Sequence, residues 1–87
     1  MIKLKIKNID EYCNYVLESD NKVYEVNINF MDINKPSEGD YVYMPEKALK
    51  ENVSLNFGPI NNDNLNEDDI IVLSNKGNKI YLQRFFG

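Results

Sequence analysis

The chain has 87 residues, 43% of them hydrophobic and 28% charged, and its formal net charge is −4. This length allows one domain with a small core, so we treat residues 1–87 as a single domain. The acidic total disfavours long-range attraction to nucleic acid or to an anionic membrane, although a local patch can still act.

The single cysteine, Cys13, limits the chemistry further. It excludes an internal disulfide and any metal site built from several cysteines, and it fits a reducing compartment. The chain contains no histidine, so Cys13 lacks the usual base of a cysteine nucleophile and is expected to be a small buried side chain.

The first residues alternate between apolar and charged side chains, which predicts a strand over residues 2–6 with one wet side. The inward set is Ile2, Leu4 and Ile6, and the outward set is Lys3, Lys5 and Lys7. Alternation leaves no continuous apolar stretch for a signal peptide or a membrane span. We therefore expect a cytoplasmic protein that does not enter membranes.

Two more strands are predicted at residues 12–18 and 22–31, joined by polar turns at 8–11 and 19–21. In the first we place Cys13, Tyr15 and Leu17 inward, with the opposite phase left open. The second has a clear apolar face made of Tyr24, Val26, Ile28 and Phe30. The outer face of this pair is polar and partly anionic, with Asn14, Glu18, Glu25, Asn27 and Asn29.

The middle of the chain is punctuated by glycine and proline. A surface connection over 32–38 leads to Gly39-Asp40 and a short strand over 41–44. Pro45 begins a predicted helix of at most two turns over 45–51, because proline is favoured at the first helical position. A short extended piece over 53–57 ends at Gly58-Pro59, and an acidic, asparagine-rich loop follows over 61–69.

The end of the chain predicts a hairpin. Residues 70–73 and 79–86 are two apolar runs, and 74–78 between them contain Gly77, which is free to adopt a positive φ. An isolated hairpin is not stable, so its apolar side must rest on the sheet formed by the earlier strands.

Three consecutive strands followed by Gly39-Asp40-Tyr41-Val42 resemble a small oligonucleotide/oligosaccharide-binding (OB) barrel. The segments that carry this resemblance are 4–7, 12–18, 22–30 and 39–42. It implies a mostly β fold, a small antiparallel barrel with one short helix and a C-terminal hairpin, although the predicted helix follows the Gly-Asp strand whereas OB barrels usually place it earlier. An SH3-like barrel is the alternative. The whole chain, down to its Tyr-Leu-Gln-Arg-Phe-Phe-Gly ending, is also similar to small bacterial proteins without an assigned activity.

The leading functional hypothesis is a non-enzymatic module that binds another protein. An arginine among aromatic residues is typical of an interaction anchor, and the candidate residues are Tyr81, Arg84, Phe85 and Phe86. Packing of the same residues in the core is the competing interpretation. The exposed edge of the hairpin could also pair with a second copy of the chain.

The alternative hypothesis is single-stranded nucleic-acid binding through an OB-like face. Aromatic rings stack on bases and lysines contact phosphates, and the candidate residues are Lys3, Lys5, Lys7, Tyr12 and Tyr24. The competing interpretation is that the aromatic residues belong to the barrel core and that the lysines are solvated edge residues that discourage strand pairing.

Other chemistries find little support in the sequence. Asp63, Glu67, Asp68 and Asp69 offer oxygen ligands, but their spacing does not match a calcium-binding loop, and a solvated acidic loop is expected. Asn52-Val53-Ser54 fits a glycosylation acceptor, which we treat as chance without an export signal. No phosphate-binding glycine loop, dinucleotide-binding fingerprint or nucleophile elbow is present. We expect no enzyme activity, no metal and no cofactor.

Overall fold

The computed structural model describes residues 1–31, 34–50, 54–59, 71–77 and 79–85, which form seven strands and one short helix. In chain order the elements are β1 (Ile2–Ile9), β2 (Asn14–Glu18), β3 (Val23–Phe30), β4 (Tyr41–Met44), α1 (Glu46–Leu49), β5 (Leu55–Pro59), β6 (Ile71–Lys76) and β7 (Lys79–Phe85). The mostly β prediction with one short helix is therefore confirmed. The acidic loop, Asn52, Val53 and Phe86 lie outside the described residues.

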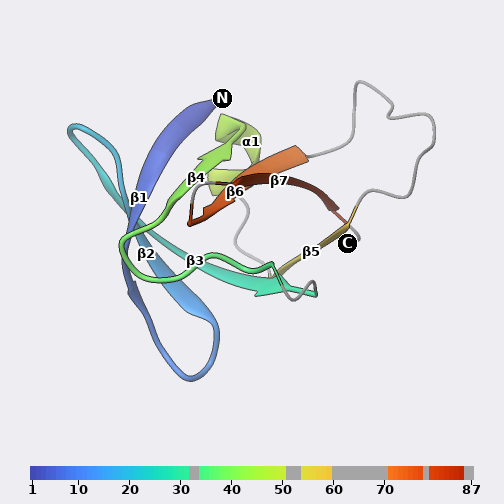
Figure 1. Cartoon of the computed structure of the whole chain (residues 1–87). Coiled ribbons are helices and arrows are strands. Elements are labelled where there is room, and N and C mark those ends of the chain that lie inside the picture. The colour runs from blue at the N-terminus through green and yellow to red at the C-terminus, as the bar shows by residue number, and fades with distance from the viewer. Residues whose placement is uncertain (32–33, 51–53, 60–70, 78, 86–87) are drawn as a thin grey trace.

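The strands close into a barrel in the order β1-β2-β3-β5-β7-β6-β4, so that β4 returns to β1 (Figure 1). Six neighbouring pairs are antiparallel, but β3 and β5 are parallel, with Phe30 opposite Phe57. The predicted all-antiparallel barrel is wrong at this point. β4 and α1 lie between β3 and β5 in the chain, and such a crossover connection is what parallel pairing requires.

The core follows the predicted alternation. Up to the β-bulge between Ile6 and Asn8 in β1, and throughout β2 and β3, every second residue faces the barrel interior, where the chain buries Leu4, Ile6, Tyr15, Leu17, Val26, Ile28 and Phe30. Ile2 and Tyr24, which were also predicted inward, are half-buried and pack against this cluster. The burial of Tyr15 and Leu17 confirms the inward phase predicted for them. A register one residue off would have turned this apolar set to solvent.

Four aromatic rings form a row across the interior, one from each of four neighbouring strands. Tyr15 of β2 meets Phe30 of β3 edge-on at 5.6 Å, and Phe30 stacks on Phe57 of β5 at 6.0 Å. Phe57 in turn contacts Phe85 of β7 at 5.9 Å between centroids. Burial raises the pKa of Tyr15 to about 12, so its hydroxyl stays protonated inside the barrel.

The loop between β1 and β2 differs from the prediction. Residues 11–13 form a turn instead of the start of a strand, so Tyr12 and Cys13 are exposed. Cys13 has φ 64, in the left-handed region, and its carbonyl accepts a hydrogen bond from the Ile28 amide at 2.9 Å. Three-residue hairpin loops commonly end on a left-handed residue, and alternating hydrophobicity does not reveal this. The buried placement predicted for Cys13 is wrong.

The glycine turn before β4 is confirmed. Gly39 has φ 91, a conformation that glycine adopts without strain, and its amide donates to the Ile6 carbonyl at 2.9 Å. The Asp40 carbonyl then accepts from the Ile6 amide at 2.9 Å. These two bonds attach the turn to β1, and β4 continues the pairing with Lys5 opposite Tyr41.

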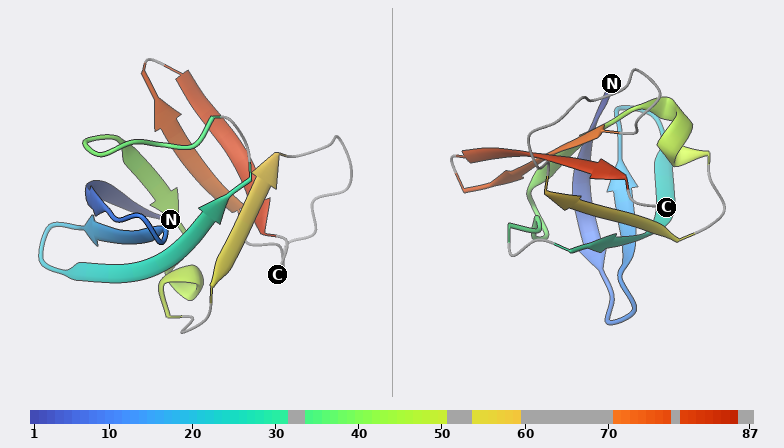
Figure 2. Two further views of the ribbon diagram at one scale, coloured as in Figure 1. Left: turned by 90° about the horizontal axis from the view of Figure 1, so that it is seen from below. Right: turned by 90° about the vertical axis from the view of Figure 1, so that its right-hand side faces the viewer.

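The C-terminal hairpin completes the barrel, as its apolar character predicted. β6 pairs with β4 on one side, and β7 pairs with β5 on the other. Gly77, with φ 62, turns the chain next to the paired residues Lys76 and Lys79. Both views of Figure 2 show the tip of this hairpin projecting beyond the neighbouring strands.

Phe57 offers a direct test of the aromatic row. It is fully buried and touches rings from two other strands, so we expect Phe57→Ala to lower the free energy of unfolding by about 3–5 kcal/mol. Phe57→Leu, which keeps most of the volume, should cost less. Urea unfolding followed by circular dichroism measures both. The control is Val23→Ala on the exposed side of β3, for which a loss as large as that of Phe57→Ala would show that the row has no special weight.

Candidate binding surfaces

An open groove of about 1040 Å³ lies beside β1, β4, α1 and the turn between β2 and β3. Four lysines and two tyrosines line it: Lys3, Lys5, Lys7, Lys22, Tyr24 and Tyr41. We call these six residues the lysine–tyrosine groove. Four of them belong to the set predicted for nucleic-acid binding.

Strand alternation and register explain how these residues come together. Leu4 and Ile6 are buried, so the lysines between and beside them must point outward. β4 then pairs with β1 so that Lys5 lies opposite Tyr41 and Lys3 opposite Tyr43. Cross-strand neighbours on one face lie about 5 Å apart, which places cations beside aromatic rings.

One of these neighbours forms a defined contact. The Nζ atom of Lys3 lies 4.5 Å from the centroid of the Tyr41 ring, which is a cation–π geometry. Tyr41 is half-buried, so part of its ring remains accessible. The groove therefore contains a cation and an aromatic ring in contact with each other.

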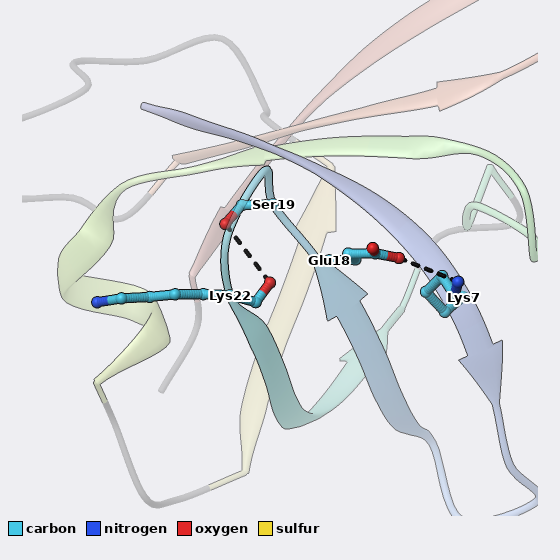
Figure 3. A network of polar contacts seen from close by, with 4 residues as sticks. All are labelled: Lys7, Glu18, Ser19 and Lys22. Carbon is cyan, nitrogen blue, oxygen red and sulfur yellow. Dashed lines mark hydrogen bonds and ion pairs between the residues drawn. The ribbon is translucent and has the colours of Figure 1, made fainter.

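The groove also contains acidic residues, namely Glu18, Asp20 and Glu46. Lys7 Nζ pairs with Glu18 Oε2 at 3.1 Å, and Lys50 Nζ pairs with Glu46 Oε1 at 3.3 Å. Figure 3 shows the Lys22 side chain extended away from the Lys7–Glu18 pair. Two of the three carboxylates are thus balanced by lysines, and the groove is cationic although the chain is acidic.

Tyr12, the remaining member of the predicted nucleic-acid set, is elsewhere. It lies in the loop between β1 and β2, is 71% exposed and does not line the groove. Tyr41 and Lys22 line the groove but were absent from the predicted set. The alternation of Tyr41 with buried Val42 could have placed its ring outward, but the sequence does not show that β4 lies next to β1.

The predicted protein-binding set divides between the two faces of β7. Tyr81 and Phe85 share the face of the fully buried Gln83, and Phe85 packs against Phe57. Arg84 is half-buried on the opposite face. Core packing therefore accounts for Phe85, as the competing interpretation expected.

The exposed apolar residues of this strand are Ile80 and Leu82, which the sequence analysis did not select. They are 62% and 40% exposed, and they alternate with Tyr81 and Gln83. In the strand register Leu82 lies opposite Leu73, Leu73 opposite Tyr43, and Tyr43 opposite Lys3. Once Gln83 is assigned to the interior, the period-two alternation of a strand predicts that Ile80 and Leu82 point outward.

A second hollow of about 410 Å³ lies over β2 and β3 and is lined by polar residues that include Asn8, Asp10, Asn14, Glu25 and Asn27.

Asp10 organises the loop between β1 and β2. Its Oδ1 accepts from the amides of Tyr12 and Asn14 at 2.8 and 2.9 Å, and its Oδ2 accepts from Asn14 Nδ2 at 2.9 Å. Asn27 Nδ2 donates to the Tyr12 carbonyl at 2.8 Å. These contacts hold the turn in place, and no group of potential metal ligands occurs among the described residues.

The Asp10 contacts predict a pH dependence. Hydrogen bonds, chiefly from the Asn14 side chain and amide, lower the pKa of Asp10 in the folded protein. A lowered folded-state pKa stabilises the protein above the carboxyl's unfolded-state pKa, and this stabilisation is lost as the pH falls through the folded-state pKa. We expect Asp10→Asn to be less stable than the wild type at neutral pH and the difference to shrink in acid. Thermal unfolding across pH tests this, and a constant difference would contradict it.

No family model, curated protein or solved structure matches the chain. Within the described residues, no helix is long and apolar enough to cross a membrane. The function therefore has to be inferred from the chemistry of the surfaces described above.

Proposed function

We propose that the protein is a non-enzymatic binding module that recognises another protein through the outer face of the C-terminal hairpin. The observation that carries this proposal is the exposure of Ile80 and Leu82 on one face of β7. Single exposed apolar residues are common on protein surfaces. Here Ile80 and Leu82 lie two residues apart on the same face of β7, in a hairpin whose tip projects beyond the neighbouring strands (Figure 2). This arrangement suits an anchor that a partner protein would bury.

The charges near Ile80 and Leu82 indicate which charges a partner protein would carry. From residue 71 to the end of the chain the sequence has three cations, Lys76, Lys79 and Arg84, and no acidic residue. Lys76 and Lys79 are exposed at the tip of the hairpin. A partner with an apolar patch bordered by carboxylates would bury Ile80 and Leu82 and place its own charges beside these lysines. Arg84 lies on the same face of β7 as Ile80 and Leu82 and borders this surface, whereas Tyr81 lies on the opposite face with Gln83.

Self-association through the hairpin is a narrower version of the same proposal. β7 already pairs with β5 over residues 83–85, so a second copy would have to add its strand along residues 79–82. Sedimentation at high protein concentration distinguishes this arrangement from recognition of a different protein.

We also propose that the fold is related to OB barrels. It is supported by three successive antiparallel strands and by the Gly39-Asp40 turn into β4. The chain departs from a five-stranded OB barrel by its additional strands and by a helix that follows β4. An SH3-like relationship remains the alternative. The proposed recognition surface depends on neither assignment.

A double substitution of the hairpin surface tests the proposal. Proteins that bind the wild type are captured from the source cells, the partner is identified and purified, and its affinity is measured by isothermal titration calorimetry. We expect Ile80→Ser with Leu82→Ser to weaken binding about tenfold or more, because buried anchors contribute much of an interface's affinity.

Val23→Ser is the matched control, since Val23 is 65% exposed on β3 and does not belong to the hairpin. It should bind like the wild type. If the folded double variant kept every partner with unchanged affinity, the hairpin would not be the recognition surface.

A further inference from the structure

We propose that the lysine–tyrosine groove is a separate binding site for single-stranded nucleic acid. The site uses β1, β4 and the turn between β2 and β3, whereas the proposed protein-binding surface uses β7. Either proposal can fail without the other.

The lysines of β1 provide a regular row of cations. Side chains two residues apart on a strand point to the same side and are separated by about 6.7 Å. Lys3 and Lys5 occupy such positions, Lys7 follows at the β-bulge between Ile6 and Asn8, and all three are exposed. An extended nucleic-acid strand presents its phosphates at regular intervals, and a row of cations follows such a backbone.

The tyrosines distinguish a nucleic acid from other anionic chains. A phosphate or a carboxylate needs a cation, but an unpaired base also gains from stacking on an aromatic ring. Tyr41 lies directly under the Lys3 ammonium, and half-buried Tyr24 lines the same groove. Bases inside a duplex are already stacked on each other, so this pairing of cation and ring favours a single strand.

The size of the groove is consistent with more than one nucleotide. Its volume of about 1040 Å³ lies just above the range for sites that hold one drug-sized molecule, about 300–1000 Å³. The groove is also open to solvent rather than an enclosed cavity. An open site of this size suits a ligand longer than one nucleotide.

The ion pairs determine which lysines are available. Lys7 is engaged by Glu18 at 3.1 Å, whereas Glu46 is engaged by Lys50, which does not line the groove. Among the charged residues that line the groove, this leaves three lysines, Lys3, Lys5 and Lys22, and one carboxylate, that of Asp20. Glu18 limits the affinity of the site because it occupies Lys7 and lies opposite Lys5 in the strand register.

The test is a fluorescence anisotropy titration of the full chain with labelled oligo(dT) and oligo(U) of about 16 nucleotides at low salt. Binding should weaken with salt, and log K against log salt should have a slope of about −2 for three contacting lysines. Lys5→Gln should weaken binding about fivefold and make the slope shallower by about 0.7. Lys47→Gln on α1, an exposed lysine that does not line the groove, should change the affinity little.

Two further variants separate this site from a general electrostatic effect. Glu18→Gln releases Lys7 and removes a negative charge, so it should tighten binding about fivefold, a result that misfolding cannot imitate. Tyr41→Phe should bind like the wild type, whereas Tyr41→Thr should lose affinity because the ring is gone. The Ile80→Ser, Leu82→Ser variant should keep wild-type affinity for the oligonucleotide.

Competition identifies the class of ligand. Unlabelled single strands should displace the probe, whereas a duplex of the same length and a polyglutamate peptide of similar charge should displace it poorly. Displacement by polyglutamate as efficient as by oligo(dT) would assign the groove to an acidic protein segment and overturn the proposal. Absence of binding to both probes at low salt, or equal losses for Lys5→Gln and Lys47→Gln, would also overturn it.

Discussion

The parallel pairing of β3 with β5 is the constraint on which the rest of the barrel depends. It places Phe30 opposite Phe57, and these stacked rings connect the N-terminal three-stranded sheet to the C-terminal part of the chain. Parallel neighbours need a long connection between them, and β4 with α1 supplies it. That connection also brings β4 round to β1, so the same crossover builds the core and closes the barrel.

The aromatic row explains why the C-terminal strand has both a structural and a recognition role. Phe85 extends the row from Phe57, and Gln83 is fully buried on the same face. Because side chains alternate across a strand, the residues between and beside them must face outward. Ile80 and Leu82 are therefore exposed as a consequence of the packing that holds β7 in place. The strand supplies core contacts on one face and an apolar surface on the other.

Charge is distributed in a similarly local way. The chain carries a net charge of −4, yet the lysine–tyrosine groove contains more lysines than carboxylates, and two of those carboxylates are paired. Exposed charges are screened beyond about 10 Å at moderate salt, so a ligand in the groove responds mainly to the nearest groups. The total charge of a small domain is thus a poor guide to the ligand of one face.

The sequence by itself determined the local features: the period of two in the first three strands, the outward direction of Lys3, Lys5 and Lys7, the turn at Gly39 and the C-terminal hairpin. Each of these follows from neighbouring residues. Only the tertiary structure decided the parallel contact of β3 with β5, the position of Tyr41 beside the β1 lysines and the partial burial of Phe85 against the core. These depend on which strands become neighbours, and that is set by packing among segments far apart in the chain. The exposed turn at Cys13 shows the same limit at short range, because the hydrogen bonds of Asp10 and Asn27 override the alternation that the residue types suggested.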